Sequence, residues 1–460
     1  MSSFKPSVAA AIVIANMIGT GVFTSLGFQL VEIQSAPVLL ALWAVGGLSA
    51  LCGAMCYAEL GAALPRSGGE YNFLGQIYHP MAGFISGWVS ATVGFAAPTA
   101  LAAMTFGSYL SAVFPALSAI WLASGVIVVL TVAHCSSHRG SGGTQRWLTL
   151  LKLLLILGFS AAALLSNDSG QLTTFAPSPG DGALLFSGAF AVSLIYVNYA
   201  YSGWNAATYI TGELENPSRN LPRVLIASTA LVCVSYLVLN YVFLSVAPMD
   251  AMVGKVEVGY VAATYAFGDA GATIMGILLA LLLISTVSAM ILAGPRVLQS
   301  IGEDFPVFRR LSGVNRDGIP ALAVSVQAGI ALIFLWSASF DRILVFSGAT
   351  MALNTFFTVA GVFVLRARRR DVPRPFRIRL YPLPPLIFLG ITGWTLIYIV
   401  LQRPVEAMIS LAIVVSGALF YWLSSRAGNY LSTSEGHAVP RAANGPGIKS
   451  QNNAPEEPHG

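Results

Sequence analysis

Two short glycine-containing stretches interrupt apolar segments of the chain and carry backbone groups that could bind a small solute. The first reads Ile18-Gly-Thr-Gly-Val-Phe and the second reads Tyr199-Ala-Tyr-Ser-Gly-Trp-Asn. Glycine disfavours a helix by about 1 kcal/mol relative to alanine, so a helix can unwind at each stretch if a ligand gains from it. The N–H groups that start the following half-helix suit a carboxylate, and the carbonyls that end the preceding one suit an ammonium group. A zwitterion such as an amino acid satisfies both ends.

Close packing between helices is the other explanation for glycines at these positions. For one GxG pair alone, the two explanations would carry equal weight. Interruptions at corresponding positions in two halves of a chain are, however, the sequence feature that best indicates a transporter's binding site. The two stretches lie in the first and sixth apolar segments, so we favour a site formed by both breaks.

A single lysine, Lys152, lies in the apolar run Leu148-Thr-Leu-Leu-Lys-Leu-Leu-Leu-Ile-Leu. A charged residue at the centre of a membrane helix costs ~2.5–3.5 kcal/mol on insertion scales and usually faces a cavity. Three roles are open for it: a fixed cation that holds the first break through its carbonyls, a proton site, or a side chain that extends to the membrane surface near Arg146.

Other residues that could do chemistry have ordinary explanations. His134 and His138 have the spacing of a metal pair, but no third ligand stands near them. Cys52 and Cys56 are one helical turn apart within an apolar run and are interpreted as packing residues. An intramembrane enzyme would need a histidine, a carboxylate and a nucleophile in matched geometry, and the apolar segments offer only scattered serines and threonines. We therefore expect no metal, no cofactor and no enzyme activity.

The composition places these motifs in a lipid-embedded chain. Of the 460 residues, 56% are hydrophobic and 9% are charged, whereas soluble domains are about a quarter charged. Apolar spans of about 20 residues, long enough to cross a bilayer, recur along the chain and predict an all-α integral membrane protein with twelve transmembrane helices. We expect these spans near residues 6–31, 37–62, 81–109, 115–135, 146–166, 183–211, 221–246, 269–300, 320–338, 341–366, 382–401 and 404–424.

The distribution of basic residues predicts that both termini are cytoplasmic. With the N-terminus inside, all but four of the 24 lysines and arginines lie on the cytoplasmic side, as the positive-inside rule requires. Three of the four, Lys255, Arg342 and Arg403, lie outside, and the fourth is the lysine within the fifth span. The run that starts at Arg366 is interpreted as an anchor for anionic lipid rather than a nucleic-acid site. Residues 1–424 form the transporter domain, and residues 425–460 are predicted to be a disordered cytoplasmic tail.

At these motifs the chain resembles the amino acid–polyamine–organocation (APC) superfamily, and within it most closely the L-amino-acid-transporter (LAT)-like exchangers. The resemblance extends over roughly residues 6–400 and implies a LeuT-like fold. Helices 1–5 and 6–10 would form inverted repeats with helices 1 and 6 broken, helices 11 and 12 would be accessory, and access would alternate between the two sides. Besides the two breaks and the lysine, the motifs are Tyr57-Ala-Glu-Leu-Gly, Pro65-Arg-Ser-Gly-Gly-Glu-Tyr, Glu213-Leu-Glu-Asn-Pro-Ser-Arg-Asn-Leu-Pro-Arg, Gly294-Pro-Arg-Val-Leu and Arg374-Pro-Phe-Arg-Ile-Arg-Leu-Tyr-Pro-Leu-Pro-Pro.

The resemblance also implies where the substrate carboxylate binds. It would meet backbone N–H groups, and a side-chain hydroxyl, around Gly19, Thr20 and Gly21. Lys152 would match the lysine that, in sodium-independent members, stands where related carriers hold a sodium ion, which disfavours a side chain that extends to the membrane surface.

The substrate amino group would bind to backbone carbonyls at both breaks. The resemblance implies the carbonyls of Met17, Tyr199, Ala200 and Ser202. The Tyr199 ring would also cover the substrate as a lid, and Asn205 would be a polar residue of the pocket.

Two site residues and one loop depart from the family pattern. Thr20 replaces the usual serine and adds a methyl group, and Tyr199 replaces the usual phenylalanine and adds a hydroxyl group. Animal members form a disulfide with a single-span partner through a cysteine between helices 3 and 4, and the corresponding loop near 110–116 has no cysteine. We therefore expect a bacterial inner-membrane protein that works without such a partner.

These features together predict a sodium-independent secondary transporter that exchanges neutral L-amino acids. Glu59 and Glu213 lie toward the cytoplasmic ends of their spans, so no acidic residue is expected near the centre of the site to hold a basic side chain. Antiport of basic amino acids or polyamines, proton-coupled symport, and a nutrient sensor without transport activity are the alternatives.

Overall fold

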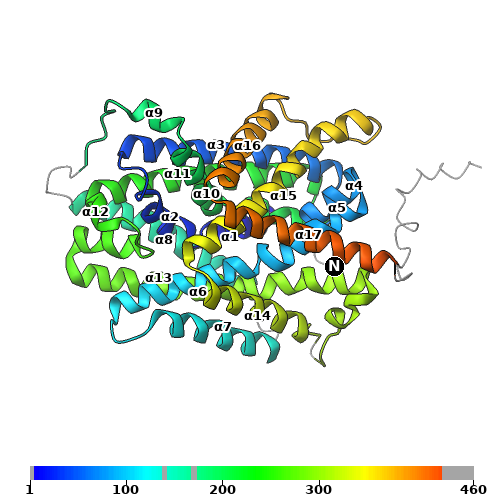
Figure 1. Ribbon diagram of the computed structural model, residues 1–460, viewed down its shortest axis with the longest axis horizontal. Coiled ribbons are helices and arrows are strands. Elements are labelled where there is room, and N and C mark those ends of the chain that lie inside the picture. Colours follow the sequence, from blue (N-terminus) through cyan, green and yellow to red (C-terminus); the bar gives the residue numbers. More distant parts are fainter. Residues whose placement is uncertain (1–4, 137–141, 167–172, 317, 427–460) are drawn as a thin grey trace, which may run out of the picture.

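The computed structural model describes residues 5–136, 142–166, 173–316 and 318–426, and the regular elements in these ranges are all helices (Figure 1). The predicted all-α class is therefore confirmed, while the expected tail lies almost wholly outside the described residues. The elements are α1 (Pro6–Met17), α2 (Gly21–Gln29), α3 (Ala36–Ala63), α4 (Gly69–Ile77), α5 (Pro80–Val89), η1 (Ser90–Gly94), α6 (Ala96–Val113), α7 (Ala119–Ser136), α8 (Gly142–Ser166), α9 (Asp181–Leu185), α10 (Gly188–Tyr201), η2 (Ala206–Glu213), α11 (Pro217–Val246), α12 (Met249–Met252), α13 (Val258–Asp304), η3 (Pro306–Ser312), α14 (Ala321–Ser337), α15 (Phe340–Arg368), α16 (Leu383–Gln402) and α17 (Pro404–Arg426).

Within the described ranges, ten helical segments are long and apolar enough to cross a membrane. Helix α14 (Ala321–Ser337) is apolar but shorter, and the sixth expected span is divided between α10 and η2. The first expected span counts among the ten, although α1 and α2 are separated by the non-helical residues 18–20. The chain is thus a multi-pass membrane protein.

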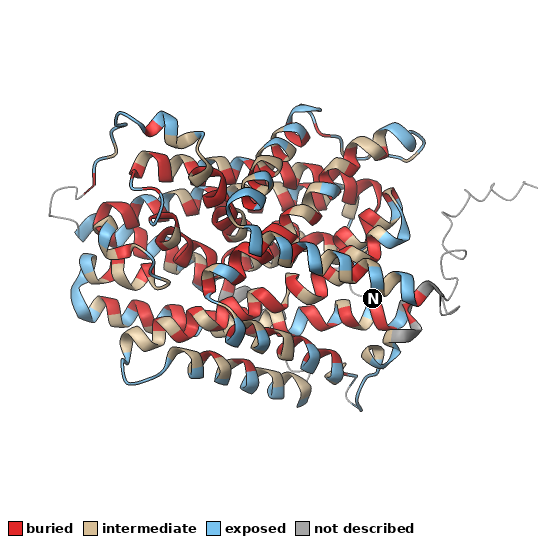
Figure 2. Cartoon of the chain, viewed as in Figure 1, coloured by how far each residue is buried: buried red, intermediate tan, exposed pale blue. Residues whose placement is uncertain are grey.

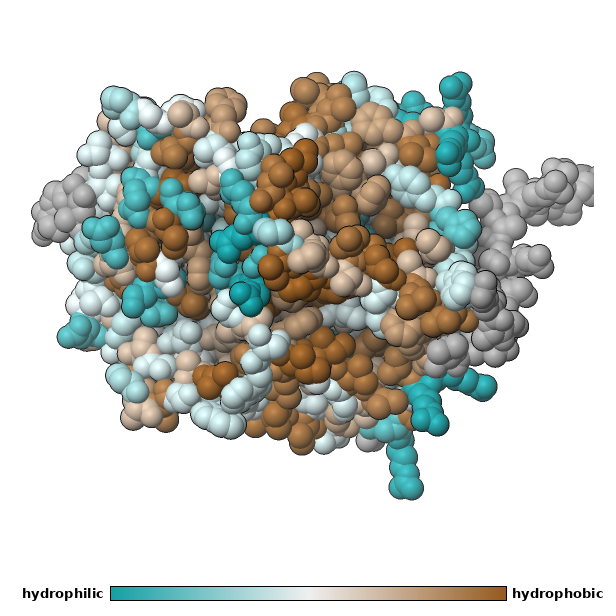
Figure 3. Space-filling view, in the orientation of Figure 1, coloured by the Kyte–Doolittle hydropathy of each residue, from teal (hydrophilic) through white to brown (hydrophobic). Residues whose placement is uncertain are grey.

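The outermost helices have the exposure pattern of a lipid-facing surface. In α7 only Ala123 and Ile127 are buried, whereas Trp121, Val129 and Val132 are each more than 60% exposed. Figure 2 shows the buried residues concentrated on the inner helices, and Figure 3 shows apolar residues through the middle of the same face. Such a large exposed apolar area is incompatible with water and is typical of contact with lipid.

The helices form two packed groups. In one group, α11 packs along α3 and against α1, and α10 packs against α2 and α3. In the other, α13 packs along α6, and α7 and α14 cover α6 from outside, along the lower edge of Figure 1. Small residues of α6 allow close approach in this second group; its core includes Ala96, Ala100, Ala102 and Ala103. The candidate site lies between the two groups.

Candidate substrate site

The two glycine-containing interruptions lie in direct contact with each other. A Cβ atom on Gly21, the first residue of α2, would lie 2.4 Å from the Ala200 Cα. A Cβ atom on Gly203 would lie 2.8 Å from the backbone carbonyl carbon of Asn16, and the φ angle of Gly203 is +96°. Glycine is required at both positions, because a side chain would collide with backbone or strain the turn. Close packing therefore accounts for both glycines, and each interruption packs against the other one.

The interruption between α1 and α2 exposes backbone donors. Among the described residues, neither the Thr20 N–H nor the Gly21 N–H has a hydrogen-bond acceptor. These groups start α2, where the helix dipole also favours an anion. The Met17 carbonyl is already occupied, because it accepts from the Tyr236 hydroxyl at 2.6 Å and from the Gly19 N–H at 2.8 Å.

The interruption between α10 and η2 exposes backbone acceptors. The Tyr199 carbonyl accepts from the Ser202 N–H at 3.0 Å. The carbonyls of Ala200 and Ser202 accept no hydrogen bond from the described part of the chain. Of the four carbonyls predicted to meet an amino group, these two are available in this conformation. The residues with free donors, Thr20 and Gly21, and those with free acceptors, Ala200 and Ser202, line one cavity, as a zwitterion requires.

Two hydroxyl groups join the interruptions. The Thr20 Oγ1 and Tyr199 Oη atoms lie 3.0 Å apart and share a hydrogen bond. Thr20 is buried, whereas Tyr199 is half-buried. Both residues are the positions at which this chain departs from the family pattern, so the bond depends on the added tyrosine hydroxyl.

One cavity of about 940 Å³ connects these groups to one end of the molecule. It is lined by all the residues predicted to contact substrate: Met17, Gly19, Thr20, Gly21, Tyr199, Ala200, Ser202 and Asn205. The lining continues to Arg66, Arg296 and Ser300, whose side chains are exposed. We call this open side the Arg66 end. The cavity has ample volume for an amino acid, and contact with substrate stays a prediction for each residue.

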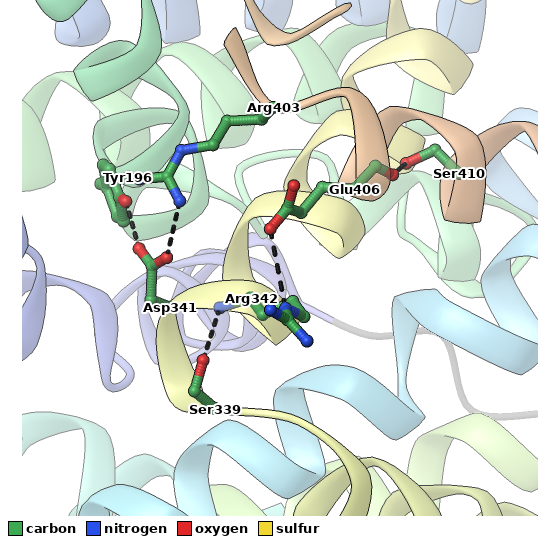
Figure 4. A network of polar contacts seen from close by, with 7 residues as sticks. All are labelled: Tyr196, Ser339, Asp341, Arg342, Arg403, Glu406 and Ser410. Atoms are coloured by element: carbon green, nitrogen blue, oxygen red, sulfur yellow. Dashed lines mark hydrogen bonds and ion pairs between the residues drawn. The ribbon is translucent and has the colours of Figure 1, made fainter.

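The opposite side, which we call the Asp341 end, is closed by aromatic and ionic contacts. Phe28 stacks on Tyr196 and Phe340, with ring centroids 5.9 and 5.4 Å apart. Figure 4 shows that the Tyr196 hydroxyl donates to the Asp341 carboxylate, which also pairs with Arg403 at 3.2 Å. These contacts join α10 and α15 to the connection between α16 and α17.

A second ion pair lies beside this closure. Arg342 and Glu406 are 3.8 Å apart (Figure 4). The two arginines predicted to lie outside, Arg342 and Arg403, therefore each have an acidic partner.

Lys152 is buried beside the first interruption. Its side chain is 4% exposed, and its Nζ atom donates to the Thr286 hydroxyl of α13 at 3.0 Å. Ile18 and Gly19 line the same small gap of about 10 Å³. The side chain does not extend to the membrane surface, which argues against that explanation. Its hydrogen bond is to Thr286, whereas the fixed-cation role had it contact the carbonyls of the first break.

A buried carboxylate that sequence reasoning missed stands behind the cavity wall. Glu70 of α4 is fully buried and accepts hydrogen bonds from the side chains of Tyr57, Asn205 and Tyr209. The sequence predicts acidic groups only near the ends of the spans, and Glu70 lies between two spans, in α4. The motif Pro65-Arg-Ser-Gly-Gly-Glu-Tyr marked the segment, but nothing in it showed that the segment packs against η2.

A π-helical turn, η1, also lines the cavity and was not predicted. Ser90, Val93 and Gly94 contribute to the lining, and the Phe95 N–H bonds to the Ser90 carbonyl at 3.1 Å. Such turns occur often at functional sites. Pro98 was an available signal, because it lacks the N–H that would bond to the carbonyl four residues earlier.

The fold and the cavity together define a class: a multi-pass helical membrane protein with a solute-sized cavity between two interrupted helices. The chain belongs to the amino acid permease family, whose model matches residues 4–425.

Relatives of known activity agree with this family. The chain is 31% identical over 432 residues to the large neutral amino acids transporter small subunit 2 of Homo sapiens, covering 90% of this chain and 79% of that protein. It is 26% identical over 425 residues to the b(0,+)-type amino acid transporter 1 of Mus musculus, covering 90% and 85%. It is 28% identical over 416 residues to the serine/threonine exchanger SteT of Bacillus subtilis, covering 88% and 93%. These three relatives are thus transporters or exchangers of amino acids.

Proposed function

We propose that this protein is a sodium-independent secondary transporter that exchanges neutral L-amino acids by alternating access. The observation that carries the proposal is the pairing of free donors at Thr20 and Gly21 with free acceptors at Ala200 and Ser202 in one cavity. These groups match the carboxylate and the ammonium that every α-amino acid has in common. The names of the relatives, which include a neutral amino acid transporter and a serine/threonine exchanger, support the substrate class and the exchange.

The remaining site residues have roles that follow from their positions. The Thr20 hydroxyl turns from Tyr199 to the substrate carboxylate, and the Tyr199 ring covers the substrate. The backbone at Gly19 and the Asn205 side chain complete the lining. The Met17 and Tyr199 carbonyls become available to the amino group only if their present partners move.

Lys152 supplies a permanent positive charge in place of a bound sodium ion. Its hydrogen bond to Thr286 links α8 to α13, and its gap adjoins Gly19. A buried cation beside the first interruption takes the place of an ion from solution, so transport does not depend on sodium.

The conformation corresponds to one end of an alternating-access cycle. In our proposal the Arg66 end is cytoplasmic, both termini lie there, and the Asp341 end faces outside. The arrangement is a LeuT-like fold of twelve helices with two inverted repeats. Its support is the separation of α1 from α2 and of α10 from η2, together with the two packed groups on either side of the cavity.

We further propose that the protein works in a bacterial inner membrane without a disulfide-linked partner. Some relatives are named as small subunits, so the point needs a separate argument. Cys52, Cys56, Cys135 and Cys233 are free, and the first, second and fourth are buried. The segment 110–116, where animal members carry the linking cysteine, has none.

The test is uptake of labelled amino acids into proteoliposomes that contain only this protein. Neutral and basic amino acids are compared with and without internal amino acid, with sodium or choline outside, and at two external pH values. Uptake of a neutral amino acid that needs internal substrate and ignores both sodium and pH is expected. Uptake without internal substrate that rises at acid pH would replace exchange by proton symport. Preference for a basic substrate would overturn the neutral class, and failure to transport any amino acid would overturn the proposal.

A further inference from the structure

A buried carboxylate connects three elements behind the cavity. The Glu70 carboxylate accepts from the Tyr57 hydroxyl of α3 at 2.9 Å and from the Tyr209 hydroxyl of η2 at 2.5 Å. It also accepts from the side-chain amide of Asn205, the residue that precedes η2. All three donors are neutral, and among the described residues no basic side chain pairs with Glu70. Three donors and no acceptor suit an ionised carboxylate.

This carboxylate holds two residues that line the cavity. Asn205 and Tyr209 both contribute to the lining, whereas Glu70 lies behind them. The Asn205 carbonyl is fixed as well, because it accepts from the Thr208 N–H at 2.8 Å and from the Thr208 hydroxyl at 2.7 Å. Asn205 ends the non-helical stretch that carries the free Ser202 carbonyl. The position of that carbonyl therefore depends on Glu70.

The residues just before Glu70 also contact η2. The Ser67 hydroxyl accepts from the Gly212 N–H at 3.0 Å. A Cβ atom on Gly69 would lie 2.8 Å from the Tyr209 ring, and the φ angle of Gly69 is +53°. Glycine is therefore needed both for the close contact and for the backbone conformation. Residues 67–70 thus run along η2, and Glu70 is the charged member of this contact.

We propose that Glu70 is a positioning residue for substrate binding: it holds the turn 202–205 so that the free Ser202 carbonyl faces the substrate ammonium, and it adds a buried negative charge behind this turn. This inference rests on the proposed amino acid transport and names the element that supports the ammonium end. Removing the charge weakens substrate binding, because Asn205 and Tyr209 lose the acceptor that orients them. The effect lies in KM rather than in the amount of folded protein.

The experiment compares Glu70→Gln with wild type in the uptake assay, with melting temperature in detergent measured in parallel. Loss of a hydrogen bond to a charged group corresponds to a KM about tenfold higher or more. We expect that increase with Vmax and melting temperature close to wild type, and a smaller increase for Glu70→Asp, which keeps the charge. An unchanged KM, or a lower melting temperature and Vmax with KM unchanged, would show a merely structural role and overturn the inference.

A second pair of variants serves if Glu70→Gln does not fold. Tyr209→Phe removes one donor to Glu70. The control is Tyr78→Phe at the C-terminal end of α4, the helix that carries Glu70; it removes a hydroxyl that donates to the Phe357 carbonyl at 2.9 Å. We expect KM to rise in the first and to stay unchanged in the second; equal effects would contradict the proposal. If wild type itself transports no amino acid, the proposed function fails. If wild type transports normally and Glu70→Gln has the same KM, only the inference about Glu70 fails.

Discussion

The Thr20 and Tyr199 hydroxyl oxygens lie 3.0 Å apart, although the two residues are 179 positions apart in the sequence. This bond joins the segment that carries the free N–H groups to the segment that carries the free carbonyls. A substrate carboxylate that binds at the start of α2 would compete with Tyr199 for the Thr20 hydroxyl. Substrate binding would thus replace the hydrogen bond between Thr20 and Tyr199 by one between Thr20 and the substrate carboxylate.

We predict that Thr20→Val weakens substrate binding moderately. Valine has the shape of threonine but lacks the hydroxyl, so the free N–H groups remain while one hydrogen bond to the carboxylate is lost. We expect KM to rise about threefold to tenfold and Thr20→Ser to stay near wild type. An unchanged KM for the valine variant would leave carboxylate binding to the backbone N–H groups alone.

Gly21→Ala should strongly impair transport while the protein still folds. Its Cβ atom would lie 2.4 Å from the Ala200 Cα, so the two interruptions must separate, and uptake should fall on the order of tenfold or more. The matched control is Gly329→Ala, because a Cβ atom there meets nothing within 4 Å. Uptake and size-exclusion profiles of both variants check the prediction. A fully active Gly21→Ala variant would contradict a site at the first interruption.

Lys152→Ala should impair transport whatever the amino acid. The variant removes the buried cation next to the first interruption, so the effect should appear for neutral and basic substrates alike. Thr286→Val, which removes the acceptor of the Lys152 hydrogen bond, should have a weaker effect in the same direction. Lys255→Ala changes an exposed lysine and is the control. Normal uptake by the Lys152 variant would mean that the buried cation is not needed for transport.

Asp341→Asn should loosen the closed end of the molecule. The Asp341 carboxylate holds both Tyr196 and Arg403, and removing one charge of such a pair leaves the other without its partner. A cysteine introduced at Ser202, which is exposed in the cavity, reports access in sealed vesicles. With Asp341 present, an impermeant thiol reagent should label it only from the Arg66 end. With Asp341→Asn, labelling should occur from both ends, and unchanged one-sided labelling would mean that the aromatic stack closes this end alone.

The multi-pass membrane class was predictable because it depends on local sequence, and the non-helical residues 18–20 and 202–205 coincide with the two glycine-containing stretches. Apolar runs of sufficient length predict spans whatever their partners are, and the glycines at 19, 21 and 203 stand directly in the sequence. The apolar neighbours of Lys152 did not decide between a buried lysine and one that reaches the membrane surface, and the structure shows it buried. The structure supports a multi-pass chain, while the count of twelve and the repeat symmetry stay predictions.

The contacts that shape the site were not predictable, because they join segments far apart in the chain. The Tyr236 hydroxyl occupies the Met17 carbonyl across 219 positions, and Glu70 reaches Asn205 across 135 positions. Neither residue has a local signature, since a tyrosine in a long helix and a glutamate in the first turn of a short helix are ordinary. Only the packing of α3, α4, α11 and η2 brings these groups together.

The direct contact of the two interruptions has an evolutionary consequence. A side chain at Gly21 or Gly203 would collide with the backbone of the other interruption. Substitutions at these positions are therefore not available to alter the part of the site proposed to bind the amino and carboxylate groups. New substrate preferences would have to arise from the surrounding walls, such as η1 and the neighbouring stretch of α15, where side chains of different size can be exchanged. Descendants of this protein could thus change which substrate side chain they prefer, while the proposed binding of the shared amino and carboxylate groups stays the same.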